Sequence, residues 1–137
     1  MGEHGDVGGH RGRSRGRPWN VLKSAYHAYA GLLWVAPRTP SIKLGIALLL
    51  ILVAVGFLLG LSPVEIAVIV LTGTLLLAIE TVNTAIELLC DRVHPAPDEM
   101  IGRVKDVAAG ATAFCEIGGA AVVLLILVPH ILRWLGR

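Results

Sequence analysis

The sequence predicts an all-α membrane protein with three transmembrane helices and an N-terminal amphipathic helix on the membrane surface. Of its 137 residues, 55% are hydrophobic and only 16% are charged, a composition typical of membrane proteins rather than soluble domains. Three stretches, at residues 42–61, 64–91 and 102–130, are long and apolar enough for the roughly 20 residues that a helix needs to cross a bilayer. A chain of this length forms one domain, which we expect at residues 19–137.

The first 18 residues form a tail that is rich in glycine and arginine and has almost no apolar side chains. Such a composition predicts disorder. Its arginines favour contact with anionic lipid headgroups, and we expect no nucleic-acid partner.

Residues 19–36 predict the surface helix. Aromatic side chains favour the boundary between lipid and water, and prolines at 37 and 40 end the helical pattern. The apolar residues recur at helical spacing: Trp19, Leu22, Tyr26, Tyr29 and Leu33.

The distribution of basic residues predicts the orientation. Arginines and lysines precede the first span and occupy the loop between spans two and three, whereas the loop between spans one and two has none. Because cytoplasmic loops carry the excess of positive charge, we expect a multi-pass protein of the inner (cytoplasmic) membrane. The N-terminus and the active site then face the cytoplasm.

A polar stripe interrupts the second span. At about 100° per residue, its five side chains fall within roughly a 100° arc of one helix face. Ionisable groups inside a membrane are costly and by default indicate a functional site, although polar contacts between helices are an alternative explanation. The stripe consists of Glu80, Asn83, Thr84, Glu87 and Asp91.

These residue types suit phosphoryl transfer to a hydroxyl at the bilayer surface. If the membrane edge lies near Asp91, Glu80 is about three turns inside the span, where a carboxylate suits a general base acting on an alcohol. Glu87 and Asp91 would lie nearer the cytoplasm, where carboxylate oxygens could bind Mg²⁺ together with phosphates. Lys105 could neutralise phosphate charge. The chain has no G-x-x-x-x-G-K-[ST] motif, so a nucleotide site would be of an unusual kind.

Two sequence blocks carry a resemblance to a known family. The pattern E-x-x-N-[ST]-A-I-E-x-x-x-D at residues 80–91, followed by G-R-x-K-D at residues 102–106, resembles the prokaryotic diacylglycerol kinase and undecaprenol kinase family. The segment from Ser24 to Leu32 is similar to that family's surface helix. The resemblance implies a homotrimer with active sites shared between neighbours, which uses ATP and Mg²⁺ to phosphorylate a lipid alcohol, either diacylglycerol or undecaprenol.

The resemblance also implies roles for individual residues. Glu80 would be the catalytic base and Glu87 a metal ligand, while Glu80 and Ala109 would contact the lipid substrate. The residues implied to bind ATP are Asn83, Glu87, Asp91, Lys105 and Asp106.

Two positions depart from the family pattern. A second metal-binding glutamate is usual shortly before the first span, but Thr39 occupies that position here. Glu116 lies in the third span, where the family is normally apolar. Because of Thr39, a second hypothesis is that the chain is a non-catalytic member of this family. The polar stripe alone would also suit a third, a small oligomeric cation or proton transporter.

Overall fold

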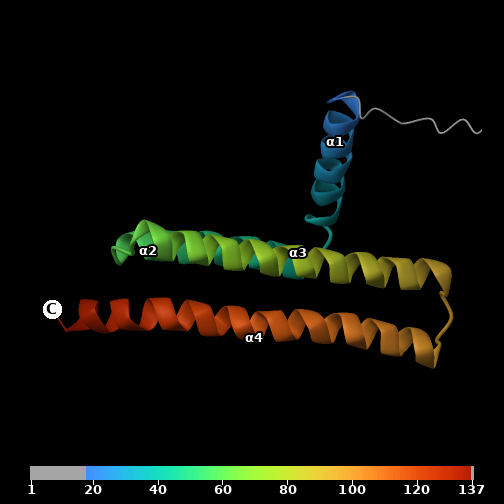
Figure 1. Cartoon of the computed structure of the whole chain (residues 1–137). Coiled ribbons are helices and arrows are strands. Elements are labelled where there is room, and N and C mark those ends of the chain that lie inside the picture. The colour runs from blue at the N-terminus through green and yellow to red at the C-terminus, as the bar shows by residue number, and fades with distance from the viewer. Residues whose placement is uncertain (1–17, 137) are drawn as a thin grey trace, which may run out of the picture.

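Four helices and short connections make up the part of the chain that the structure describes (Figure 1). The computed structural model describes residues 18–136, so the predicted basic tail lies almost entirely outside the described residues. The helices are α1 (Pro18–Val35), α2 (Pro40–Leu58), α3 (Pro63–Val93) and α4 (Glu99–Leu135). No strand occurs between residues 18 and 136.

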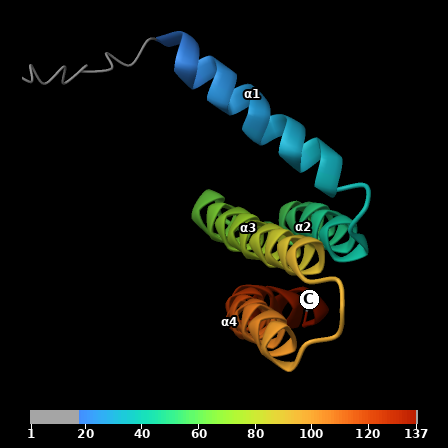
Figure 2. The ribbon, with the colours of Figure 1, turned by 90° about the vertical axis from the view of Figure 1, so that its right-hand side faces the viewer.

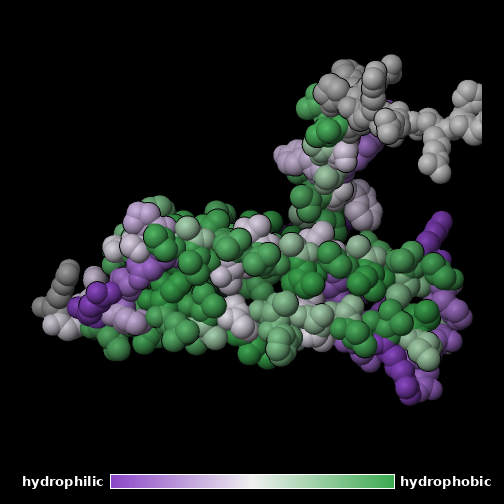
Figure 3. All heavy atoms as spheres, in the orientation of Figure 1, coloured by the Kyte–Doolittle hydropathy of each residue, from purple (hydrophilic) through white to green (hydrophobic). Residues whose placement is uncertain are grey.

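Helices α2, α3 and α4 lie side by side, and α1 stands out from this bundle (Figures 1 and 2). Helix α3 packs against both α2 and α4. All three bundle helices are long and apolar enough to cross a membrane. Hydrophobic side chains cover the length of the bundle in the face drawn in Figure 3, and hydrophilic ones gather at its two ends. The predicted all-α membrane fold class is confirmed.

The turn between α2 and α3 follows from the sequence of residues 60–65. Gly60 has φ of +71°, a left-handed conformation that glycine adopts without steric cost. The Gly60 amide donates to Phe57 O at 3.2 Å and the Leu61 amide to Gly56 O at 3.0 Å, which is the Schellman ending of a helix. Ser62 and Glu65 then form a capping box at the start of α3. The chain therefore reverses direction at once, and α2 and α3 become antiparallel neighbours.

Glycines let the helices approach closely. A Cβ atom on Gly73 would lie 2.6 Å from Leu49 Cδ1, and one on Gly45 would lie 2.8 Å from Leu77 Cδ2. On α4, a Cβ atom on Gly119 would lie 2.8 Å from Leu76 Cδ1. Small residues are the usual means of close helix packing in membranes, and these contacts fix which residues of neighbouring helices lie at the same level.

The buried core lies toward the α2–α3 turn. It is formed by Leu61, Ile69 and Leu127, with partly buried leucines, isoleucines and valines around them. Most other large apolar side chains are exposed in the single chain. Because lipid tails are as apolar as leucine, these side chains suit a bilayer or neighbouring subunits.

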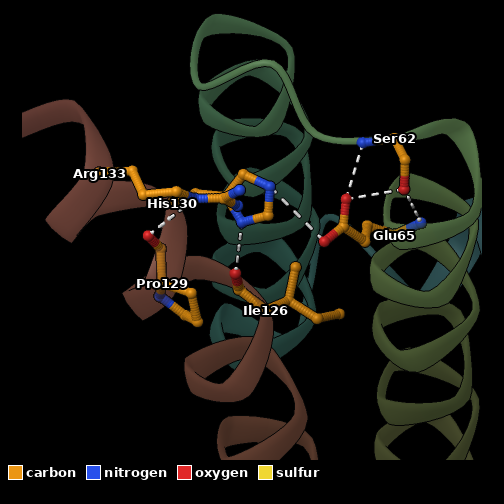
Figure 4. A network of polar contacts seen from close by, with 6 residues as sticks. All are labelled: Ser62, Glu65, Ile126, Pro129, His130 and Arg133. Carbon is orange, nitrogen blue, oxygen red and sulfur yellow. Dashed lines mark hydrogen bonds and ion pairs between the residues drawn. The ribbon is translucent and has the colours of Figure 1, made fainter.

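Polar contacts join α3 to α4 at the same end of the bundle (Figure 4). His130 Nε2 lies 3.6 Å from Glu65 Oε1, and His130 Nδ1 donates to Ile126 O at 2.9 Å. Arg133 Nε donates to Pro129 O at 3.3 Å. The capping glutamate of α3 therefore also holds the last turns of α4.

Candidate functional site

The polar stripe follows one face of α3 toward the α3–α4 loop, at the opposite end from the core. Glu80 is half-buried near the start of α2, and Asp91 is exposed near the loop. Eleven residues separate these two carboxylates, which corresponds to about 16 Å along the helix axis.

Glu80 is held by a residue of another helix. The Ser41 hydroxyl, in the first turn of α2, donates to Glu80 Oε1. Within residues 18–136, Glu80 Oε2 has no hydrogen-bond donor. Within α3, the Thr84 hydroxyl donates a hydrogen bond to the Glu80 carbonyl oxygen at 2.9 Å. Ser41 was not among the predicted site residues, since its only signal in the sequence is a hydroxyl residue at the start of a span.

A cavity of about 450 Å³ lies between α2, α3 and α4. Ser41, Glu80 and Glu116 line it from these three helices in turn. The remaining lining is almost entirely apolar and includes Leu48 and Leu76. Glu80 therefore lies where an apolar cavity meets the polar stripe.

Asn83 and Glu87 form the middle of the stripe. Asn83 Nδ2 donates to Glu87 Oε1 at 3.0 Å, and the Asn83 side chain is buried, with 9% of its surface exposed. In the described part of the chain, Asn83 Oδ1 is buried and accepts no hydrogen bond. An unsatisfied buried acceptor costs about 1–3 kcal/mol, so a donor or cation from outside the chain would stabilise this position.

The end of the stripe contacts α4. Lys105 Nζ forms an ion pair with Asp91 Oδ1, and 33% and 66% of the two side chains are exposed. The loop between the helices is short because Asp98 caps α4 and accepts from the Ile101 amide at 2.9 Å. This hydrogen bond lowers the pKa of Asp98 below its usual value.

The remaining candidate residues have fewer contacts. Asp106 and Ala109 are exposed on α4, and no side-chain hydrogen bond or ion pair reaches Asp106 from the described residues. Thr39 is the N-cap residue of α2, and its side chain forms no capping hydrogen bond. Ser41, two residues later, is the residue that contacts the stripe.

The donor set suits a cation that also binds phosphate. No three His, Cys, Asp or Glu side chains converge within residues 18–136, so these residues alone do not form a metal cage. Mg²⁺ usually takes one or two protein carboxylates and completes its shell with water and substrate phosphates. Glu87, with the unpaired oxygen of Asn83 beside it, fits that mode of binding.

Comparisons with known proteins give one family. The chain matches the family model described as prokaryotic diacylglycerol kinase over residues 26–127. It is 29% identical over 114 residues to a diacylglycerol kinase of Synechocystis sp., and this match covers 82% of the chain and 65% of that protein. It is 27% identical over 101 residues to a diacylglycerol kinase of Haemophilus influenzae, covering 72% of the chain and 86% of that protein. The chain thus spans less than two thirds of the first relative's length.

Proposed function

Because the chain belongs to the prokaryotic diacylglycerol kinase family, we propose that it is a membrane lipid kinase, which transfers the terminal phosphate of ATP to the hydroxyl of a membrane lipid. The observation that carries this proposal is the position of Glu80. It lies at the end of an apolar cavity, and the polar stripe begins at the same residue. A lipid in the cavity and a nucleotide along the stripe would meet at this carboxylate.

The length of α2 supports this arrangement. Helix α2 has 19 residues and is therefore about 28 Å long, close to the hydrocarbon thickness of a bilayer. Its first turn contacts Glu80. If the two ends of α2 mark the edges of the hydrocarbon, Glu80 lies at one membrane edge. The rest of the stripe on α3 then extends into the water beyond that edge. The membrane edge is then about three turns nearer to Glu80 than the sequence suggested.

Glu80 would act as a general base. Ser41 donates to Oε1, which leaves Oε2 free to accept the proton of a lipid hydroxyl. As that proton moves to Glu80, the lipid oxygen bonds to the terminal phosphorus, the bond from phosphorus to the leaving oxygen breaks, and ADP departs. General base catalysis of this kind contributes about 10²- to 10⁴-fold in rate.

The stripe beyond Glu80 would hold MgATP. Glu87 supplies a carboxylate and Asn83 an unpaired amide oxygen, so these two residues would bind the cation. Bound Mg²⁺ would offset the negative charge of the phosphates during transfer. Lys105 lies close enough to pair with Asp91 and would contact the phosphates, with Asp91 and Asp106 completing the nucleotide contacts. Ala109 would leave room for the substrate.

The protein would function as a homotrimer. In the single chain most large apolar side chains are exposed, and a Cβ atom at Gly110 or Gly118 on α4 would meet no neighbouring atom within 4 Å. Both observations favour packing against further subunits. The distribution of basic residues favours a position of the site on the cytoplasmic side of the inner membrane.

Transfer of radiolabelled phosphate tests the function. Purified protein in mixed micelles would receive ATP, Mg²⁺ and either diacylglycerol or undecaprenol, with Glu80→Gln as the matched control. We expect labelled lipid from the native protein and a loss of at least about 100-fold with Glu80→Gln. Absence of transfer to any lipid by a well-folded native protein would favour a non-catalytic relative.

A further inference from the structure

The cavity beside Glu80 contains a second carboxylate that the proposed phosphate transfer does not use. Glu116 lines the same cavity as Glu80. It is exposed in the single chain, and no side-chain hydrogen bond or ion pair reaches it within residues 18–136. A carboxylate near the membrane edge without a polar partner is costly. Its ligand is therefore expected to come from outside the chain.

Glu116 and Glu80 lie at the same level of two antiparallel helices. The Asp91–Lys105 ion pair fixes the register of α3 and α4. Glu80 precedes Asp91 by eleven residues and Glu116 follows Lys105 by eleven residues, so both carboxylates lie about 16 Å from the ion pair along their helices.

The same spacing fixes the direction of both side chains. Eleven residues turn a helix through about three full turns, so Glu80 shares the face of Asp91 and Glu116 shares the face of Lys105. Because Asp91 and Lys105 point toward each other, the two glutamates also face the space between α3 and α4. The contact of Gly119 with Leu76, one turn deeper on both helices, supports the same register.

The cavity therefore has a polar end and an apolar body. Ser41, Glu80 and Glu116 lie at the polar end, and leucines with Ile69 and Val123 line the deeper part. The two carboxylates therefore line one cavity from neighbouring helices, together with the Ser41 hydroxyl. This shape fits an amphiphile with a compact head and an aliphatic chain.

We propose that Glu116 accepts a hydrogen bond from a second hydroxyl of the lipid acceptor, beside the hydroxyl that Glu80 activates. This inference rests on the proposed lipid kinase function. An ionised carboxylate only accepts hydrogen bonds, so a lipid with one hydroxyl, such as diacylglycerol or a polyprenol, leaves Glu116 without a donor. A lipid with two adjacent hydroxyls, as in a monoacylglycerol, satisfies both carboxylates. Glu116 is then a specificity residue that favours such acceptors.

The test compares acceptors across variants of Glu116. Phosphate transfer to 1-monooleoylglycerol, 1,2-dioleoylglycerol and undecaprenol would be measured for the native protein, Glu116→Gln and Glu116→Leu. Glu99→Gln is the matched control, because it removes a carboxylate of α4 whose ion pair with Arg103 lies outside the cavity.

We expect Glu116→Leu to lower the kcat/KM ratio of monooleoylglycerol to dioleoylglycerol about tenfold, through KM of the lipid, since one hydrogen bond to a charged group is lost. The KM of ATP should stay unchanged, and Glu99→Gln should leave the ratio unchanged. Equal fold-changes for all three acceptors would overturn the proposal. So would dissociation of the oligomer with Glu116→Leu in size-exclusion chromatography, because Glu116 would then serve an interface.

A binding measurement separates this proposal from the proposed function. Monooleoylglycerol should raise the Tm of the native protein more than that of Glu116→Leu, and dioleoylglycerol should raise both equally. Equal shifts with both lipids would refute the role of Glu116 even if phosphate transfer is observed. If the native protein transfers no phosphate but the difference in Tm is present, the kinase proposal fails and Glu116 still recognises the second hydroxyl.

Discussion

Replacing Ser41 tests whether its hydrogen bond prepares Glu80 for catalysis. Ser41→Ala removes the hydroxyl that donates to Glu80 Oε1 and leaves α2 otherwise unchanged. A hydrogen bond to a charged group contributes about 1.5–3 kcal/mol. Ser41 is exposed and water can replace its hydroxyl, so the lower end of this range applies. Since about 1.4 kcal/mol corresponds to tenfold in rate, we expect kcat to fall about tenfold.

Steady-state phosphate transfer measures this effect, with separate determination of kcat and of KM for lipid and ATP. Ser41→Thr is the matched control, because it retains a hydroxyl and should keep most of the activity. The KM of ATP should not change, since the nucleotide would bind farther along α3. A normal kcat for Ser41→Ala, or a loss confined to the KM of ATP, would refute the view that Ser41 orients Glu80.

Three further changes test the nucleotide end, the packing and the departure from the family pattern. Lys105→Met should raise the KM of ATP at least about tenfold. The Tm should change little, because the ion pair with Asp91 is partly exposed and such a pair contributes at most about 1 kcal/mol to stability. Gly73→Ala should destabilise the protein by about 1–3 kcal/mol in detergent, because its Cβ would meet Leu49. Gly31→Ala is the matched control, because this glycine lies on α1 with open space around its Cβ position, and the change should not destabilise the protein. Thr39→Glu should lower the Mg²⁺ concentration for half-maximal activity, and an unchanged or higher value would show that Thr39 does not face the cation.

The sequence was sufficient to predict the fold class, because hydropathy and composition alone identify helices that can cross a membrane. It did not define where the helices end. Helix α4 begins at Glu99 because Asp98 caps it, whereas the predicted stretch began three residues later at 102. Helix α3 continues to Val93, two residues beyond the predicted end of the span at 91. A helix can extend past the hydrocarbon, because its end depends on its backbone hydrogen bonds and not on the surrounding lipid.

The residues of the candidate site that share one face of α3 could be predicted from the sequence. The contacts between these residues and other helices could not. Helical periodicity places Glu80 and Glu87 on one face without reference to any other helix. The contact of Ser41 with Glu80 depends on the register of α2 against α3, which is set by the fit of Gly45 against Leu77. Such a fit follows from the shapes of particular side chains, and hydropathy contains no information about it.

The position of Glu80 would also explain how the proposed kinase brings together two incompatible substrates. A lipid hydroxyl stays at the membrane surface because its chains are held in the hydrocarbon, and phosphates stay in water because burying their charge is prohibitive. Chemistry between them requires a carboxylate at the boundary. Helix α2 begins beside Ser41, at the proposed boundary, whereas α3 continues beyond it through Glu87 to the pair of Asp91 and Lys105. The unequal lengths of the helices, 19 residues for α2 and 31 for α3, would therefore create the proposed site, because the longer helix would present one continuous face to both lipid and water.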